Sequence, residues 1–240
     1  MNLAIRGFSA DLGKTHGDTF RKDQFPDLKF DYILANPHFN DSDWGGEKYE
    51  NDIRWKYGRP PVGNANYAWL QHIIWKLKPN GQAGVILSNG SMSSNSSGEG
   101  EIRKSIIQDD IVEVMIELPG QLFLNTPVPC CLWFLNKDKT KYGCDRRKKT
   151  LFIDARKLGE MKTRSLKILT AENINKIKNI DISWRQNKDY KDVPGFFKSC
   201  SIEEIERNNF MLTPGRYVGI KDKGNNKIDL NNIKNLVDEL

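Results

Sequence analysis

Short apolar runs alternate with segments of helical periodicity along the first two-thirds of the chain, and this order limits the fold more than any other feature. Residues 30–35, 83–87 and 112–118 are apolar runs typical of buried strands. Between them, residues 65–78 and 101–108 place apolar side chains at helical spacing. The β-α-β-α-β order predicts an α/β fold with a parallel, doubly wound sheet and right-handed crossovers.

Two further strands are predicted after a proline-rich connection that runs from residue 119 to residue 129. They are Cys130–Leu135 and Leu151–Asp154, and we expect them to be added at the edge as an antiparallel hairpin. Because successive side chains of a strand alternate between faces, Cys130 and Cys131 should point to opposite sides of the sheet.

The chain changes character after about residue 156, where the pattern becomes mainly helical. Thr170 is a candidate helix cap, and Ser201 with Glu204 forms a capping box. We therefore divide the chain into a sheet domain, residues 1–156, and a helical C-terminal appendage, residues 157–240. The last segment has the spacing of a coiled-coil seam, although a helix docked on its own domain explains it equally well. The seam positions are Leu230, Ile233, Val237 and Leu240.

A polar segment rich in glycine and serine spans residues 88–100. Such a composition offers little to pack, so we predict a mobile loop between the second strand and its helix.

Basic residues exceed acidic ones by 37 to 31, which gives a net charge of +6 and leaves room for a polyanionic partner without proving one. The densest basic segment is residues 137–149. It is either a contact for phosphates or simply a solvated hairpin loop.

The sequence also excludes several classes of protein. No apolar run reaches the roughly 18 residues that cross a membrane, and the N-terminus lacks the pattern of a secretion signal. The four cysteines form no CxxC pair, so we expect reduced thiols in a cytoplasmic protein. His16 and His72 have no second ligand at metal spacing, and no metal site is predicted.

The tetrapeptide Asn36-Pro37-His38-Phe39 directly follows the first predicted strand, where ligands bind in open α/β sheets. The Asn36 side chain and the Pro37 backbone each offer a carbonyl acceptor, and Phe39 offers an aromatic face. Two acceptors suit the two N–H groups of an exocyclic amine, and the ring suits a base flipped out of a duplex. Asn-Pro is equally a common turn signal.

Longer strings around this tetrapeptide resemble the methylation subunit of type I restriction-modification systems, over nearly the whole chain. They include Asp31–Asn40, Arg59–Gly63, Asn66–His72, Leu87–Ser91, Glu117–Phe123, Phe152–Ala155 and Leu212–Gly219. The resemblance implies a Rossmann-like methyltransferase sheet and S-adenosylmethionine-dependent N6-adenine methylation of double-stranded DNA. It also implies a complex with a specificity subunit and a motor-nuclease subunit.

By the same resemblance, Asn36 and Pro37 correspond to the acceptors of the adenine N6 group, and Phe39 to the aromatic that stacks on the base. The family has a second proline where this chain has His38, which removes a restriction on the conformation of Pro37. His38 could alternatively act as a general base.

The cofactor half of the site is the larger departure from the family. No glycine-rich loop follows a strand in the residues that precede Asn36. Asp18 matches the family's acidic position near the cofactor adenine, although its Gly-Asp-Thr setting is also an ordinary turn. We therefore expect the C-terminal part of such a subunit, with an apolar sheet edge that favours self-association. The alternative is a non-catalytic assembly or DNA-binding remnant.

Overall fold

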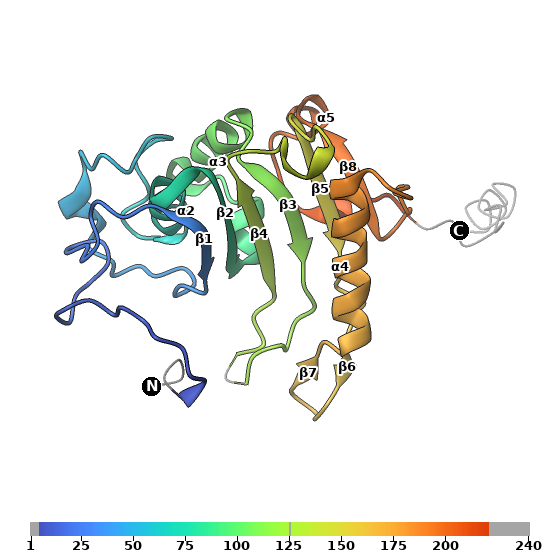
Figure 1. Ribbon diagram of the computed structural model, residues 1–240, viewed down its shortest axis with the longest axis horizontal. Coiled ribbons are helices and arrows are strands. Elements are labelled where there is room, and N and C mark those ends of the chain that lie inside the picture. Colours follow the sequence, from blue (N-terminus) through green and yellow to red (C-terminus); the bar gives the residue numbers. More distant parts are fainter. Residues whose placement is uncertain (1–4, 125, 221–240) are drawn as a thin grey trace, which may run out of the picture.

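The computed structural model describes residues 5–124 and 126–220, which form a mixed sheet with helices on both faces (Figure 1). The predicted strands appear as β1 (Phe30–Ala35), β2 (Leu77–Ser88) and β3 (Val112–Glu117), and the predicted helices as α2 (Asn66–Lys76) and α3 (Glu99–Gln108). The α/β class is thereby confirmed. No helix in the described part of the chain is both long and apolar enough to cross a membrane.

The two later strands lie inside the sheet, so their predicted place at its edge is wrong. β4 (Cys130–Asn136) pairs antiparallel with both β2 and β3, and β5 (Lys149–Asp154) lies between β3 and β8 (Phe197–Ser201). The strand order is β1-β2-β4-β3-β5-β8, so β2 and β3 run in the same direction without pairing. A strand with apolar side chains on both faces, such as β4, is stable only in the interior of a sheet.

Two apolar cores lie on the two faces of this sheet. α2 and α3 pack on one face, in a core that includes Cys131, and α4 (Ala171–Gln186) packs on the other, in a core that includes Cys130. The predicted opposite orientation of the two cysteines is therefore confirmed.

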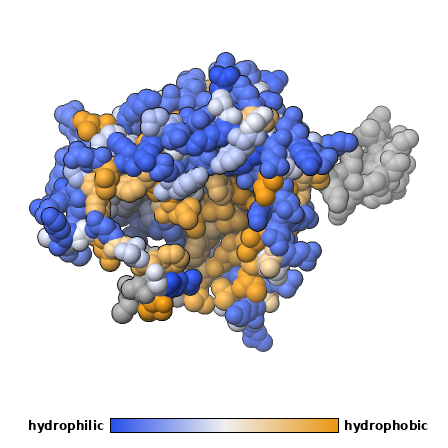
Figure 2. Space-filling model, viewed as in Figure 1, coloured by the Kyte–Doolittle hydropathy of each residue, from blue (hydrophilic) through white to orange (hydrophobic). Residues whose placement is uncertain are grey.

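α4 covers one face of the sheet at β5. The same face is largely uncovered at β1, β2 and β4. Figure 2 shows apolar side chains gathered there, in the middle of the view. On the edge strand β1, Tyr32 is 70% exposed and Leu34 is 88% exposed. The predicted apolar sheet edge is thus present among the described residues.

The region after residue 156 contains the predicted caps. Thr170 caps α4 in a capping box with Asn173, and the Ser201 side chain accepts a hydrogen bond from the Glu204 backbone at α5 (Ile202–Arg207). Up to residue 220, this region contains three strands that were not predicted: β6 (Glu160–Met161), β7 (Lys167–Ile168) and β8, which joins the main sheet. The coiled-coil positions from Leu230 to Leu240 lie outside the described residues. The described residues also contain five short 3-10 turns: η1 (Gly46–Tyr49), η2 (Asn89–Met92), η3 (Ser96–Gly98), η4 (Lys141–Gly143) and η5 (Pro214–Arg216).

Part of the polar segment at residues 88–100 is packed, which corrects the prediction that it would not pack. Ser91 and Met92 are each only 1% exposed. The Tyr67 hydroxyl donates to the Ser91 carbonyl at 2.6 Å, and the indole of Trp133 donates to the Ser91 hydroxyl at 3.0 Å. Hydrogen bonds from distant aromatic residues thus compensate for the lack of apolar side chains.

Buried ion pairs hold part of the basic segment at residues 137–149, an outcome that neither interpretation of its charge foresaw. Arg146 and Glu113 are each 1% exposed, and two guanidinium nitrogens of Arg146 donate to Glu113 Oε1 at 3.1 Å. Arg185 of α4 donates to Glu113 Oε2 at 2.6 Å. Arg146 therefore fastens its loop to β3, and Arg185 fastens α4 to the same strand.

We expect the chain to lose stability as the pH falls, because the imidazole of His72 is buried. Burial and the neighbouring Arg54 cation lower the pKa of His72 to about 4. A group with a depressed pKa contributes stability that is present above its unfolded pKa, near 6.5, and lost as the pH falls toward 4. Relative to His72→Gln, the native chain should lose about 2 kcal/mol of unfolding free energy between pH 7 and pH 5. Urea titrations at both values test this, with exposed His38→Gln as control. Equal losses in the native chain and His72→Gln would refute it.

Candidate functional site

The tetrapeptide Asn36–Phe39 lies at the carboxyl edge of the sheet. β1 is parallel to β2, β3 is parallel to β5, and both β2 and β3 are antiparallel to β4, so β1, β2, β3 and β5 end at the same edge (Figure 1). This is where a doubly wound sheet binds its ligands.

A pocket of about 760 Å³ brings the predicted residues together. One wall is formed by residues 36–40 and the other by Phe123, Leu124, Thr126 and Val128, from the connection between β3 and β4. Asn36 is exposed, so its amide can reach a bound group, whereas Pro37 and Phe39 are half-buried. The pocket therefore combines two carbonyl acceptors with an aromatic side chain.

Phe123 is a pocket residue that sequence reasoning did not assign. Its ring lies edge to face against Phe39, with centroids 5.9 Å apart and planes at 74°. Phe123 ends the string Glu117–Phe123 that resembles the family, and this was a signal in the sequence. Only the fold shows that the β3–β4 connection reaches back to β1. Together the two rings give the pocket an apolar wall.

Asn40 is the second residue that sequence reasoning missed. Its backbone N–H donates to Asn66 Oδ1 at 3.0 Å, and its own Oδ1 accepts hydrogen bonds from Asn66 Nδ2 at 2.8 Å and from the Ser88 hydroxyl at 2.9 Å. These bonds tie the tetrapeptide to the first residue of α2 and the last residue of β2.

Asp18 lies in a turn and does not line the pocket of Asn36. Its carboxylate accepts hydrogen bonds from the backbone N–H groups of Phe20 and Arg21, at 2.8 and 3.3 Å. The neighbouring Gly17 and Thr19 line a separate pocket of about 770 Å³ against β1 and α2. The predicted contact between Asp18 and a cofactor stays a prediction.

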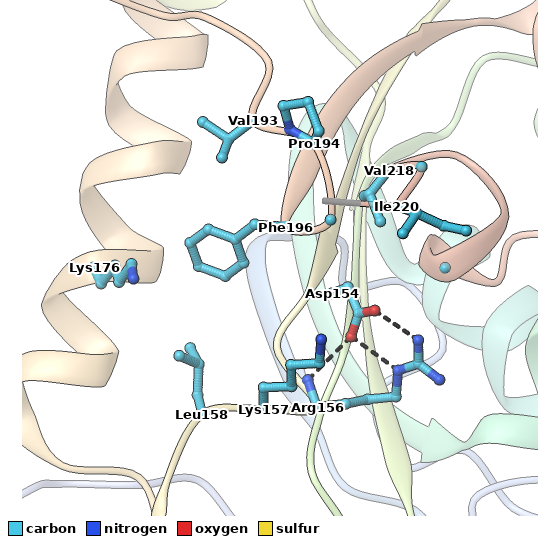
Figure 3. A pocket seen from close by; sticks show the side chains of 13 residues that line it. Asp154, Arg156, Lys157, Leu158, Lys176, Val193, Pro194, Phe196, Val218 and Ile220 are labelled. Carbon is cyan, nitrogen blue, oxygen red and sulfur yellow. Dashed lines mark hydrogen bonds and ion pairs between the residues drawn. The ribbon is translucent and has the colours of Figure 1, made fainter. Parts of the chain in front are cut away.

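A third cavity, of about 750 Å³, lies beyond the end of β5 (Figure 3). Within it the Arg156 guanidinium donates to both oxygens of Asp154, at 2.9 and 2.6 Å. Although burial acts to raise it, these bonds hold the pKa of Asp154 below its ordinary value. Arg156 also lies 3.5 Å from Glu117, whose pKa is raised by burial. The cavity shares no lining residue with the pocket of Asn36.

Comparisons with known proteins agree on one family. A family model described as N-6 DNA Methylase matches residues 1–226. The type I restriction enzyme HindI methylase subunit of Haemophilus influenzae is 52% identical over 93% of this chain and 49% of its own length. The MjaIX methylase subunit of Methanocaldococcus jannaschii is 42% identical over 92% of this chain and 40% of its own length.

A solved structure has the same fold. The type I restriction-modification methyltransferase subunit from Streptococcus thermophilus superposes with a TM-score of 0.77 and 29% identity, over 90% of this chain and 45% of that one. The chain thus spans about half the length of the relatives that it matches.

Proposed function

The chain belongs to the N-6 DNA methylase family, and from this membership we propose that it serves in S-adenosylmethionine-dependent N6-adenine methylation of DNA. Its role is that of a modification subunit, or part of one, in a type I restriction-modification complex. The observation that supports this most is the pocket in which Asn36, Pro37 and Phe39 meet at the carboxyl edge of the sheet.

The chemistry follows from the positions of these residues. The Asn36 side-chain carbonyl and the Pro37 backbone carbonyl accept hydrogen bonds from the two N–H groups of the adenine N6 amine. These bonds draw the nitrogen lone pair out of conjugation with the ring, so that it could attack a methyl group supplied by S-adenosylmethionine. The bond between that methyl group and the sulfur would break, and the N6 nitrogen would lose one proton to the solvent. Phe39 and Phe123 contact the flipped base. Taking the base out of the duplex costs a few kcal/mol in lost stacking, and the contacts in the pocket have to offset this cost.

S-adenosylmethionine supplies the methyl group when bound, but the residues of this chain do not fit a complete site for it. The sequence before Asn36 has no glycine-rich loop, and one oxygen of the Asp18 carboxylate accepts hydrogen bonds from its own turn. We therefore propose that residues outside these 240 supply most of the cofactor site and that Asp18 contributes at its margin. Calorimetry with S-adenosylmethionine should give no micromolar binding by this chain alone, and such binding would show that its own residues suffice.

The partners that we propose follow from the family and from the surface. They are double-stranded DNA, the specificity subunit and the motor-nuclease subunit, with residues 157–240 serving subunit assembly. The exposed Tyr32 and Leu34 of edge strand β1 favour pairing with a further strand, including self-association. Sedimentation of the native chain and of Leu34→Lys tests the last point. We expect Leu34→Lys to be more monomeric than the native chain. Equal association of the two proteins would show that edge strand β1 does not mediate self-association.

Shortening the stacking aromatic should weaken methyl transfer. We expect Phe39→Ala to lose roughly 1–3 kcal/mol of transition-state stabilisation, because one face of the base loses its partner. The measurement is kcat/KM for methyl transfer by the assembled complex. Phe8→Ala is the matched control, since Phe8 is 63% exposed and lines none of the three pockets. An unchanged rate for Phe39→Ala would show that its ring is structural.

The second candidate function is a non-catalytic assembly or DNA-binding role, which His38 in place of the family's second proline favours. The two functions differ in one assay on the same complex. If the chain recovers the specificity subunit in a pull-down, and the complex transfers no labelled methyl group to DNA even with the remaining family sequence added, the assembly role is selected. Labelled methyl transfer eliminates it.

A further inference from the structure

The tetrapeptide Asn36–Phe39 lies between two fixed points of the chain. On one side, Ala35 is paired with Val85 in the sheet. Residues 36–38 then have no regular secondary structure, and Asn36 is exposed. The orientation of the Asn36 amide therefore depends on how firmly the chain is held on the other side, at Asn40.

Three hydrogen bonds hold Asn40, and we call Asn40, Asn66 and Ser88 the Asn40 latch. Asn66 both accepts from the Asn40 backbone and donates to the Asn40 side chain, at 3.0 and 2.8 Å. The Ser88 hydroxyl donates to the same Oδ1 at 2.9 Å. Because Asn66 is 2% exposed and Ser88 is 4% exposed, water has little access to compete for their side of these bonds.

The anchors of the latch are themselves held in place. The Asn66 N–H donates to Asn64 Oδ1 at 3.0 Å, and the Ser88 carbonyl accepts from the Ser91 hydroxyl at 2.8 Å. One residue further along, the Asp41 carbonyl accepts from the Ala65 N–H at 2.9 Å. The latch thus connects the tetrapeptide to two rigid elements, α2 and β2.

The backbone explains why asparagine suits position 40. Its φ is +53°, in the left-handed region that asparagine adopts more readily than most residues. This turn directs the chain from the pocket toward α2, while the side chain faces Ser88 and Asn66. Glycine would keep the turn and lose the two side-chain hydrogen bonds, and aspartate would keep both.

We propose that Asn40 is a positioning residue for methyl transfer: through the latch it fixes the Asn36–Phe39 segment in the orientation that accepts the adenine amine. This inference rests on the proposed function. Asn40 acts through Asn36 and Pro37, because a misplacement of about 1 Å in a reacting group can cost about 100-fold in rate.

The first test measures order in the segment and needs no activity. Amide hydrogen exchange of the residue-40 N–H, which donates to Asn66 Oδ1 in the native chain, is compared among the native chain, Asn40→Gly, Asn40→Asp and Asn187→Gly. Asn187 is the matched control, an exposed asparagine with φ +48° at the end of α4. We expect about tenfold or faster exchange in Asn40→Gly, beyond what its lower unfolding midpoint accounts for, and native exchange in the other two. Native exchange in Asn40→Gly would overturn the proposal.

The second test separates positioning from general stability. In the assembled complex, Asn40→Gly should lower kcat for methyl transfer about 100-fold with little change in the KM for DNA, and Asn187→Gly should change neither. Faster exchange with an unchanged kcat would refute the positioning role. If the native complex transfers no methyl group, the proposed function fails and the positioning role with it, whereas the exchange data still report whether the latch orders the segment.

Discussion

Glu113→Gln should destabilise the chain by about 3–5 kcal/mol, because it leaves the buried Arg146 guanidinium without its counter-charge and removes one of the two carboxylates that pair with Arg185, the other being Asp181. Glu113 accepts from Arg146 at 3.1 Å and from Arg185 at 2.6 Å, and it also accepts from Asn136 Nδ2 at 2.9 Å. Glutamine keeps the size of the side chain but removes its charge and replaces one acceptor with a donor. The loss should appear as a lower urea midpoint, with parallel loosening of β3, α4 and the loop of Arg146.

An exposed ion pair in the same basic segment provides the control. Asp145 and Arg147 pair at 2.6 Å, with side chains 55% and 66% exposed. Asp145→Asn should therefore leave the urea midpoint nearly unchanged, because water screens an exposed pair. If the two variants lose the same amount of stability, Glu113 is not the electrostatic anchor that the structure indicates.

Asn36→Ala should lower kcat for methyl transfer by about 10²–10³-fold, or roughly 3–4 kcal/mol, which is typical for the loss of one pre-positioned hydrogen-bond partner of a transition state. The Asn36 side chain is exposed, so the fold should be unaffected. Because Phe39 still contacts the base, the KM for DNA should change less than kcat.

The matched control for this variant is Asn175→Ala, at an exposed position on α4. It should have native kcat and native stability. An Asn36→Ala complex that keeps native kcat would show that the amine is activated by other groups. A fall in stability equal to the fall in rate would instead indicate a structural role for Asn36.

Local signals in the sequence were sufficient to locate several elements. The apolar run at β1 and the helical spacing in α2 depend on residues close together in the chain, as do the caps Thr170 and Ser201. The Asn36–Phe39 tetrapeptide could be placed at a strand end for the same reason. Hydrophobic periodicity and capping are properties of a few consecutive residues, and tertiary structure seldom overrides all of them.

Features that depend on distant residues could not be predicted. The insertion of β4 between β2 and β3 is a choice among strand pairings that have similar local patterns. The burial of Arg146 depends on Glu113, which lies 33 residues earlier in the chain. Likewise, Phe123 meets Phe39 only because the β3–β4 connection returns to the end of β1. Such long-range contacts leave no periodic signal in a single sequence.

The most direct test of the central claim is the fate of a labelled methyl group. The chain is combined with the specificity subunit and with a polypeptide that carries the remaining family sequence, and the complex is given labelled S-adenosylmethionine and DNA. Digestion of the DNA to nucleosides then locates the label. We predict label on adenine N6 with the native chain and a loss of about 10²–10³-fold in its rate with Asn36→Ala. Label on another atom, or an undiminished rate with Asn36→Ala, would contradict the assignment of this pocket to the target adenine.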